Sequence, residues 1–348
     1  MTPRNDIIRD ERGAALIYVV LFMLSSLWFV SLAIDMGKLT VTKGELQRAA
    51  DAAALAGASA VKAQDPNGEL DQAQARSRAA FFGAQNTALR ESSEPVVIDP
   101  NTDIIFLDAH TIQVTARREG GNAMTTIFAK TIGISSMNLQ AVATAKSIPV
   151  DEPCQSLAPM APVQIAGGYS TACGTTYDLK IGSGGKNPSP GNFQLLDYGT
   201  NCQEPPLCQG GLGPRIECWT ANGYGCCVKV GDTFVDTAPG NKVGPFSKGM
   251  QQRWDSDTDQ TENICYSAYH GNGKRVVACP IVTASSSGGR TNATIIGFAT
   301  FFLVNNPKHT GGGSIAKGQF INYVIPGNGT TQPPVGPTLY TVRLIQNQ

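Results

Sequence analysis

The chain has 348 residues, 41% of them hydrophobic, and its 27 basic and 27 acidic side chains give a formal net charge of zero. The length allows roughly two domains beyond a membrane anchor. No cluster of lysine and arginine stands out, so the charge gives no reason to expect a nucleic acid as partner. The histidines His110, His270 and His309 are far apart in sequence, which leaves little material for a histidine-based metal or acid–base site.

Residues Ala14–Ile34 form an uncharged apolar run that predicts a transmembrane helix. A helix of this length covers roughly 30 Å, the thickness of the hydrocarbon core of a bilayer. The alternatives are a buried core helix and the apolar part of a cleaved signal peptide, which has a shorter run followed closely by small residues. Here Asp35 follows the run, and Ala-x-Ala patterns such as Ala58-Ser59-Ala60 occur only in the alanine-rich stretch well beyond it. We therefore expect an anchor that is not removed.

The helix is predicted to continue beyond the membrane, because no proline interrupts Asp35–Lys62 and apolar or small residues recur there at helical spacing. Ala49–Ala60 consists almost entirely of small residues, which let a neighbouring backbone approach closely and so predict a packing face. Gly37 and Gly44 each weaken a helix by up to about 1 kcal/mol, and we consider them candidate hinges.

The remainder of residues 35–148 predicts a compact α+β domain. Asp65–Gly68 is a strong turn signal. Helices are predicted at Glu69–Leu89 and Ala123–Ile132, and strands at Val96–Ile98, Ile104–Leu107, Thr111–Ala116 and Met137–Lys146. Pro149–Pro153 is the expected linker to the second domain.

Residues 154–348 predict a mainly β domain. Strands are expected at Tyr177–Ile181, Phe193–Tyr198, Cys227–Val230, Arg275–Thr283, Ile295–Val304, Gln319–Ile325 and Tyr340–Leu344. Ile295–Val304 is the candidate for a central strand buried on both faces. One helix is expected at Ser247–Trp254, with Ser247 as its N-cap. Asn201–Tyr224 and His309–Lys317 are expected to be long loops. The predicted class is α+β: a transmembrane helix that extends into a small α+β domain, followed by a mainly β, disulfide-containing domain.

All nine cysteines lie in this second domain, at Cys154, Cys173, Cys202, Cys208, Cys218, Cys226, Cys227, Cys265 and Cys279. Zinc sites usually show C-x₂₋₄-C pairs with partners set apart, and these spacings do not fit that pattern. A disulfide framework is therefore expected, in an oxidising compartment. Because the number is odd, at least one thiol is free or pairs with another chain. The connectivity stays open.

The cysteines also decide the expected topology, because the charges that flank the anchor are balanced. Arg4, Arg9 and Arg12 precede it, and Lys38, Lys43 and Arg48 follow it. An exported cysteine-containing body places the N-terminal tail of residues 1–13 in the cytoplasm. The expected location is a bacterial inner membrane, crossed once, with the body periplasmic or extracellular.

Two motifs were considered as ligand sites. The glycine-rich Ile181–Asn187 has the wrong spacing for a phosphate loop and lacks the Ser or Thr after the lysine. The carboxylates Asp255, Asp257, Asp259 and Glu262 resemble the start of a calcium loop. The sixth and twelfth positions hold Gln260 and Tyr266, so only a calcium site outside the EF-hand class is compatible. No other cofactor is indicated. No nucleophile stands beside an evident base, so we expect no enzyme.

Three blocks within residues 12–60 closely resemble the N-terminal region of TadG-like proteins of the tight-adherence (Tad) machinery, which assembles Flp-type pili. They are Arg12-Gly13, the step Ile34–Leu39 at the end of the apolar run, and the alanine-rich Leu46–Ala58. Pilin-like relatives have a glycine cleavage site and a glutamate at the fifth position after it. In this chain the fifth residue after Gly13 is Tyr18, which favours a component that stays in the membrane.

The resemblance implies a non-enzymatic role in assembling, anchoring or presenting an adhesive Flp pilus. The implied partners are the lipid bilayer and other Tad pilus or secretion components, with oligomerisation left open. One alternative is a minor pilin or filament subunit, for which processing at Gly13 would be diagnostic. Another is a membrane-tethered adhesive or ligand-binding module, which a groove or calcium site in residues 154–348 would favour.

Overall fold

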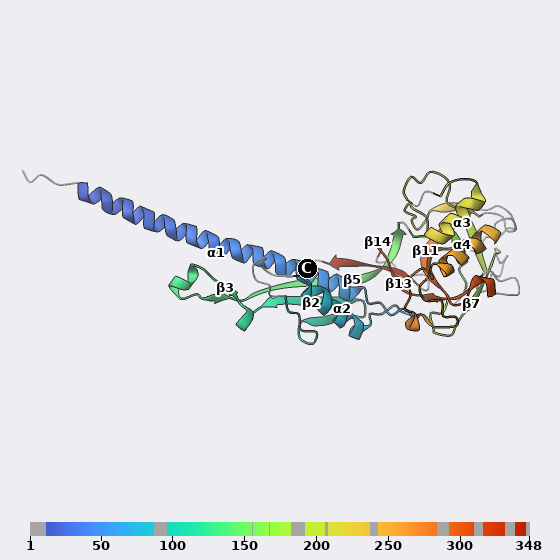
Figure 1. The fold of residues 1–348 in the computed structure, drawn as a ribbon, viewed down its shortest axis with the longest axis horizontal. Helices are drawn as coiled ribbons and strands as arrows, with labels where there is room; N and C mark the ends of the chain where they lie inside the picture. Colours follow the sequence, from blue (N-terminus) through green and yellow to red (C-terminus); the bar gives the residue numbers. More distant parts are fainter. Residues whose placement is uncertain are drawn as a thin grey trace, which may run out of the picture. The chain divides into compact units, whose positions relative to one another are not determined.

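The computed structural model describes residues 12–86, 96–154, 156–166, 168–181, 192–205, 208–236, 243–283, 292–309, 316–330 and 338–345. The helices are α1 (Arg12–Ala58), α2 (Gln72–Ala84), α3 (Leu212–Asn222) and α4 (Val243–Asp255). The strands are β1 (Ile104–Asp108), β2 (Thr111–Arg118), β3 (Met124–Thr125), β4 (Ser136–Met137), β5 (Leu139–Pro153), β6 (Met160–Pro162), β7 (Tyr177–Ile181), β8 (Asn192–Asp197), β9 (Thr233–Asp236), β10 (Val276–Val282), β11 (Asn292–Leu303), β12 (Ala316–Ile321), β13 (Tyr323–Val324), β14 (Gly327–Gly329) and β15 (Leu339–Ile345). Figure 1 shows their arrangement.

The chain forms two compact units. Unit 1 comprises Met1–Ala53, Ala79–Ile104 and Val114–Ala143. Unit 2 comprises Ala54–Arg78, Ile105–Gln113 and Thr144–Gln348. The N-terminal apolar helix, the mixture of helices and strands and the cysteine-bonded C-terminal region confirm the predicted α+β class.

The first element, α1, is one uninterrupted helix of 47 residues. It passes through Gly37 and Gly44 without a break, so neither glycine is a hinge in this structure. The predicted alanine-rich packing face is confirmed, because Ala49, Ala50 and Ala53 are fully buried. The helix is followed by the predicted turn, in which the Asp65 carboxylate accepts hydrogen bonds from the amides of Asn67 and Glu69.

The second half of unit 1 differs from the prediction in one important place. Ala123–Ile132 is not a helix: it contains the two-residue strand β3 and the 3₁₀ turn η2 (Ala129–Ile132). β3 pairs with β4 in an antiparallel hairpin. Pro149–Pro153, the predicted linker between the two domains, form the end of strand β5, where Pro149 pairs with β15 and the residues from Val150 to Pro153 pair with β14.

Unit 2 has as its core the predicted central strand. β11 lies between β10 and β12 in a seven-stranded sheet of order β10-β11-β12-β7-β8-β6, in which β9 also pairs with β11 and β8. Every side chain from Phe298 to Leu303 is buried, as expected for a strand covered on both faces. A second sheet has the order β1-β2-β5-β15-β13, with β14 pairing with β5.

Two helices pack together in unit 2, and the sequence predicted only one of them. α4 begins at Val243, so Ser247 lies inside the helix and is not its N-cap. α3 lies in the segment that was expected to be a loop. Gly249 of α4 allows the close approach, since a Cβ there would lie 2.7 Å from the carbonyl oxygen of Glu217. The predicted strand Cys227–Val230 is not a regular strand: Cys227 forms a single bridge with Cys154, and the amides of Val228 and Val230 donate to the carbonyl oxygens of Pro153 and Asp151.

Candidate functional site: the membrane anchor and its junction

The apolar half of α1 has the properties of a membrane span. Its large side chains are exposed along Leu16–Ile34, Phe29 by 75%. Among the described residues it is the one helix that is long and apolar enough to cross a bilayer. The hydroxyls of Ser25 and Ser26 donate to the carbonyl oxygen of Phe22, and Ser31 donates to that of Leu27. The hydroxyl donors of these serines are therefore satisfied within the helix. An unsatisfied donor would cost free energy in the hydrocarbon core of a bilayer.

The apolar run ends at an anchored carboxylate. Asp35 is buried, and its oxygens accept hydrogen bonds from the backbone amides of Ile127, Phe128 and Ala129 at 2.8, 3.0 and 2.7 Å. The amide of Ile127 contributes most to lowering the pKa of Asp35. Hydrogen bonds to a carboxylate favour its charged form, so this junction is held by an anion in a cradle of three amides.

One helical turn further on, Lys38 reinforces the same junction. Its Nζ donates to the carbonyl oxygen of Thr125 at 2.7 Å. Asp35 and Lys38 thus hold the β3–β4 hairpin, Met124–Met137, against α1 by two charged side chains. The sequence pointed to Asp35 only as the end of the apolar run. Its partners lie more than ninety positions later, and no local pattern indicates them.

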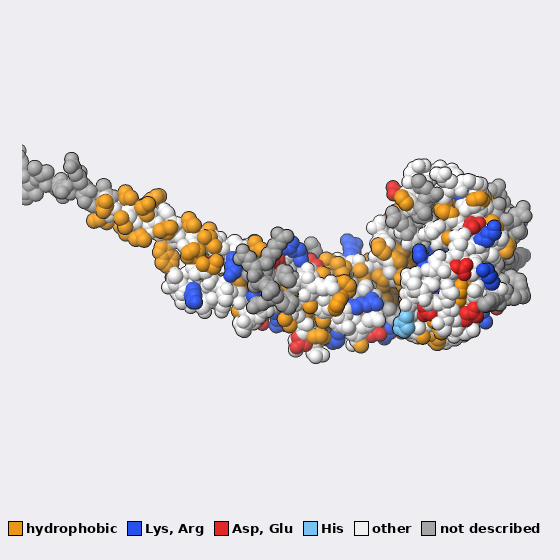
Figure 2. All heavy atoms as spheres, in the orientation of Figure 1, with side chains coloured by type: hydrophobic (Ala, Val, Ile, Leu, Met, Phe, Trp, Pro, Cys, Tyr) orange, Lys and Arg blue, Asp and Glu red, His pale blue; other side chains and the backbone are white. Residues whose placement is uncertain are grey.

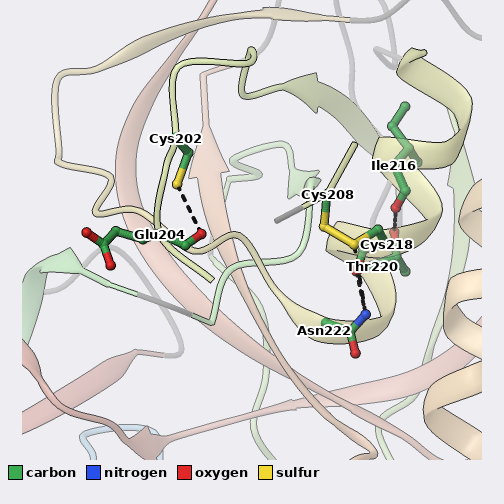
Figure 3. The surroundings of a disulfide bond; sticks show 7 residues. All are labelled: Cys202, Glu204, Cys208, Ile216, Cys218, Thr220 and Asn222. Carbon is green, nitrogen blue, oxygen red and sulfur yellow. Dashed lines mark hydrogen bonds between the residues drawn. A yellow bond between two sulfur atoms is a disulfide. The ribbon is translucent and has the colours of Figure 1, made fainter. Parts of the chain in front are cut away.

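The cysteines of unit 2 form four disulfides and leave one free thiol, which confirms the disulfide framework and the odd cysteine. The pairs are Cys154–Cys227, Cys173–Cys265, Cys202–Cys226 and Cys208–Cys218. Figure 3 shows the last of these joining α3 to the preceding loop. Cys279 is fully buried in β10, and burial raises the pKa of its thiol.

The carboxylates considered for calcium have protein partners instead. The Asp257 carboxylate accepts a hydrogen bond from the Tyr269 hydroxyl at 2.6 Å. The Asp259 carboxylate accepts one from the backbone amide of His270 at 3.0 Å. Further along, Glu262 accepts the amide of Asn306, and Asp255 accepts the side-chain amide of Gln251. Across the described residues, no three histidine, cysteine or acidic side chains come together in a way that could hold a metal ion.

A buried arginine, which the sequence did not single out, organises this acidic loop. The Arg275 guanidinium is fully buried 4.4 Å from the centre of the Trp254 ring. Its Nη1 donates to the carbonyl oxygens of Asp259 and Thr261 at 2.8 and 3.0 Å. The Arg275 amide donates to the Asp257 carboxylate at 2.9 Å. A cation from the protein itself therefore lies at the centre of the loop, and this gives the loop a structural role.

The structure does not test two further features of the sequence, the glycine-rich motif Ile181–Asn187 and the candidate cleavage site at Gly13. Residues 182–187 of the glycine-rich motif lie outside the described residues. Gly13 is within α1, and Tyr18 is exposed on its apolar half. Neither observation tests cleavage at Gly13.

Comparison with known proteins gives one match. Residues 13–60 match the family described as "Putative Flp pilus-assembly TadE/G-like". The matched segment contains the apolar run, the Asp35 junction and the buried alanine face, and it confirms the resemblance carried by residues 12–60. No curated protein and no solved structure matches the chain. The match indicates involvement in Flp pilus assembly.

Proposed function

Given that residues 13–60 form a TadE/G-like segment, we propose that this chain is a single-pass membrane component that assists assembly, anchoring or presentation of an adhesive Flp-type pilus. The observation that carries the proposal is α1 itself. Its first half is an exposed apolar helix of bilayer length, and one face of its continuation, including Leu46, Ala49, Ala50 and Ala53, is buried. The anchor therefore passes without a break into a helix that packs in unit 1.

The junction supports retention in the membrane. Asp35 directly follows the apolar run. The three hydrogen bonds that its carboxylate accepts from backbone amides fix unit 1 at the end of that run. Tyr18 stands where pilin-like relatives have a glutamate, so the signal for a polymerising subunit is incomplete. The role is accordingly that of a fixed component that holds its body next to the assembly machinery.

The disulfides support the orientation. Disulfides form and persist in oxidising compartments, and the four bridges all lie after the anchor. The proposed topology therefore has residues 1–13 in the cytoplasm of a bacterial cell and the body on the outer side of the inner membrane. There, the disulfide-bonded β domain would contact other pilus or secretion components, and the proposed role is non-enzymatic.

The test combines membrane extraction, N-terminal sequencing and counting of surface pili. The native chain should remain in membranes after alkaline washing, keep an N-terminus upstream of Ala14, and restore pili to cells that lack it. The double variant Leu24→Arg/Leu27→Arg adds charge to the span at a cost of roughly 5–7 kcal/mol, and should lose membrane retention and pili together. Thr40→Arg/Val41→Arg changes exposed positions of the same helix beyond the span, and should keep both.

Three outcomes would contradict the proposal. A mature N-terminus at Ala14 in sheared filaments would make the chain a minor pilin. Normal pili in cells that contain only the Leu24→Arg/Leu27→Arg variant, released from the membrane, would show that anchoring is not part of the role. Alkylation of the eight cysteines of the four bridges without prior reduction would contradict the exported topology.

A further inference from the structure

We propose that the β3–β4 hairpin, Met124–Met137, is a second membrane contact, which inserts its apolar side chains into the headgroup region of the leaflet on the side of the body. The inference rests on the proposed membrane anchoring by α1. It adds a lipid-binding surface in a part of the chain that the family match does not reach.

The hairpin lies at the end of the apolar run. Asp35 is the first residue after the apolar run. Its carboxylate accepts a hydrogen bond from the backbone amide of each of Ile127, Phe128 and Ala129. Ser31, one turn inside the run, is already half-buried, although Val30 and Leu32 on either side are exposed. In Figure 1 the hairpin lies along α1 with its tip directed towards the N-terminal end of the helix. When α1 spans a bilayer, this tip lies at the level of the headgroups.

The hairpin exposes several large apolar side chains. Its exposed fractions are 53% for Ile127, 37% for Phe128, 58% for Ile132, 46% for Ile134 and 37% for Met137. No acidic residue occurs from Met124 to Met137, and the one charged side chain is Lys130. Figure 2 shows hydrophobic side chains along the first half of α1, next to which the hairpin lies in Figure 1. Exposed apolar clusters of this kind mark interaction surfaces.

The backbone of the hairpin is prepared for a medium poor in water. The Asp35 carboxylate accepts three of its amides. The amide of Thr126 donates to Ser135, that of Ile134 to Ala129, and that of Gly133 to Lys130. The tip therefore offers few free backbone donors, which is the requirement for placing non-helical chain near hydrocarbon.

These features favour lipid over a protein partner. The patch continues the exposed apolar surface of α1, so a protein that covered it would itself have to lie in the leaflet. Lys130 suits phosphate headgroups, because a lysine stem can lie along apolar surface while its ammonium reaches a phosphate. Two contacts with the bilayer, one spanning and one superficial, would also fix the rotation of α1 about its axis.

The experiment places a fluorescent probe in the full-length chain, reconstituted in vesicles of phosphatidylethanolamine and phosphatidylglycerol. Ile132→Cys is labelled with an environment-sensitive maleimide. Cys279 is buried and the other cysteines are paired, so labelling of the unchanged chain gives the background. Emission at Ile132 should shift to shorter wavelength and lose intensity to a lipid with a quencher near its headgroup, while aqueous iodide has little effect.

Val97→Cys is the matched control within unit 1. Val97 is an exposed aliphatic residue like Ile132, and its neighbour Ile98 packs at Gly83, where a Cβ would lie 3.4 Å from Cβ of Ala53. Ala53 lies about 27 Å along α1 from Asp35 at 1.5 Å per residue. A probe at Val97 should be quenched by iodide and not by lipid. A probe at Leu24→Cys, in the middle of the span, should be quenched by a lipid that carries its quencher deep in the acyl chain, and not by iodide.

The outcomes are separable. If the Leu24 probe escapes the acyl-chain quencher, the proposed anchoring fails. If Leu24 is quenched by lipid but Ile132 responds to iodide as Val97 does, only the hairpin proposal fails. Protection of Ile132 from both quenchers would assign the patch to a protein surface, and would also overturn the proposal. Adding Asp35→Ala should release the hairpin, so the lipid quenching at Ile132 is lost while that at Leu24 remains.

Discussion

The four disulfides should stabilise unit 2 unequally, and a bridge that closes a longer loop should contribute more. Cys173 and Cys265 are 92 positions apart, whereas Cys208 and Cys218 are 10 apart. A crosslink restricts the unfolded chain more when its loop is longer. The loop-entropy relation gives about 4.6 kcal/mol for the first bridge and about 2.7 kcal/mol for the second. Replacing both cysteines of a bridge by serine should therefore cost about 2 kcal/mol more for Cys173–Cys265 than for Cys208–Cys218.

Urea unfolding in detergent micelles measures this difference. Trp219 and Trp254 are buried in unit 2, so their emission reports its unfolding, and Trp28→Phe removes the signal of the anchor. With a slope of about 3 kcal/mol per molar urea, the two double-serine variants should have midpoints roughly 0.6 M apart, that of the long-loop variant being lower. Equal midpoints, or a lower midpoint for the Cys208–Cys218 variant, would refute the loop argument. A parent midpoint unchanged by reductant would show that the bridges are not formed.

Three further changes test the junction, the core and the acidic loop. Asp35→Ala should speed hydrogen exchange of the three amides that it binds, measured by mass spectrometry of the peptide that covers the hairpin. Gly318→Ala should destabilise the sheet by about 1–3 kcal/mol, because a new Cβ would lie 2.5 Å from the Phe301 ring. For Asp259, hydrogen bonds led by the His270 amide lower the pKa from 3.8 to about 2. The stability that its charge provides is therefore complete above about pH 4 and is lost as the pH falls through about 2. The difference in unfolding midpoint between the parent and Asp259→Asn should follow that course.

Each of these has a control and a contrary result. Asp51→Asn, on the same helix as Asp35, should leave exchange in the hairpin unchanged; equal exchange in the Asp35→Ala variant and the parent would contradict the cradle of amides. Gly44→Ala has no atom within 4 Å of the new Cβ and should stabilise α1 by about 0.5–1 kcal/mol, opposite in sign to Gly318→Ala. A midpoint difference at Asp259 that stays constant from pH 5 to pH 2 would show that its carboxylate contributes through contacts other than charge.

The sequence sufficed where the signal was long and local. Ala14–Ile34 and the alanine face of α1 carry one kind of residue over many turns, and Ile295–Val304 is an apolar run that only a doubly covered strand accommodates. α3 was missed because Gly213 and Pro214 in its first turn are typical of loops. The helix gains its stability from the Cys208–Cys218 bridge and from packing on α4, neither of which is visible along the sequence.

The candidate site was predictable only in part, for a related reason. The anchor could be predicted, whereas the hairpin at its junction was expected to be a helix. The Asp35 carboxylate accepts hydrogen bonds from the backbone amides of Ile127, Phe128 and Ala129, more than ninety positions later in the sequence. This tertiary contact overrides the local preference of the segment for a helix. Likewise Arg275 is a single arginine before a strand, and nothing in its neighbourhood indicates that it fills the acidic loop.

Strand β15 has a consequence for the order in which the chain folds. It pairs antiparallel with β5, from Tyr340 opposite Pro149 to Ile345 opposite Thr144. These partners are separated by roughly 200 residues of sequence, and such distant pairings form slowly. A chain that crosses the membrane in sequence order exposes this edge of β5 until β15 arrives, while the short Cys208–Cys218 loop can already close. During that interval the unpaired edge is open to other strands, so in the proposed topology a chaperone that covers edge strands would act on this part of the chain first.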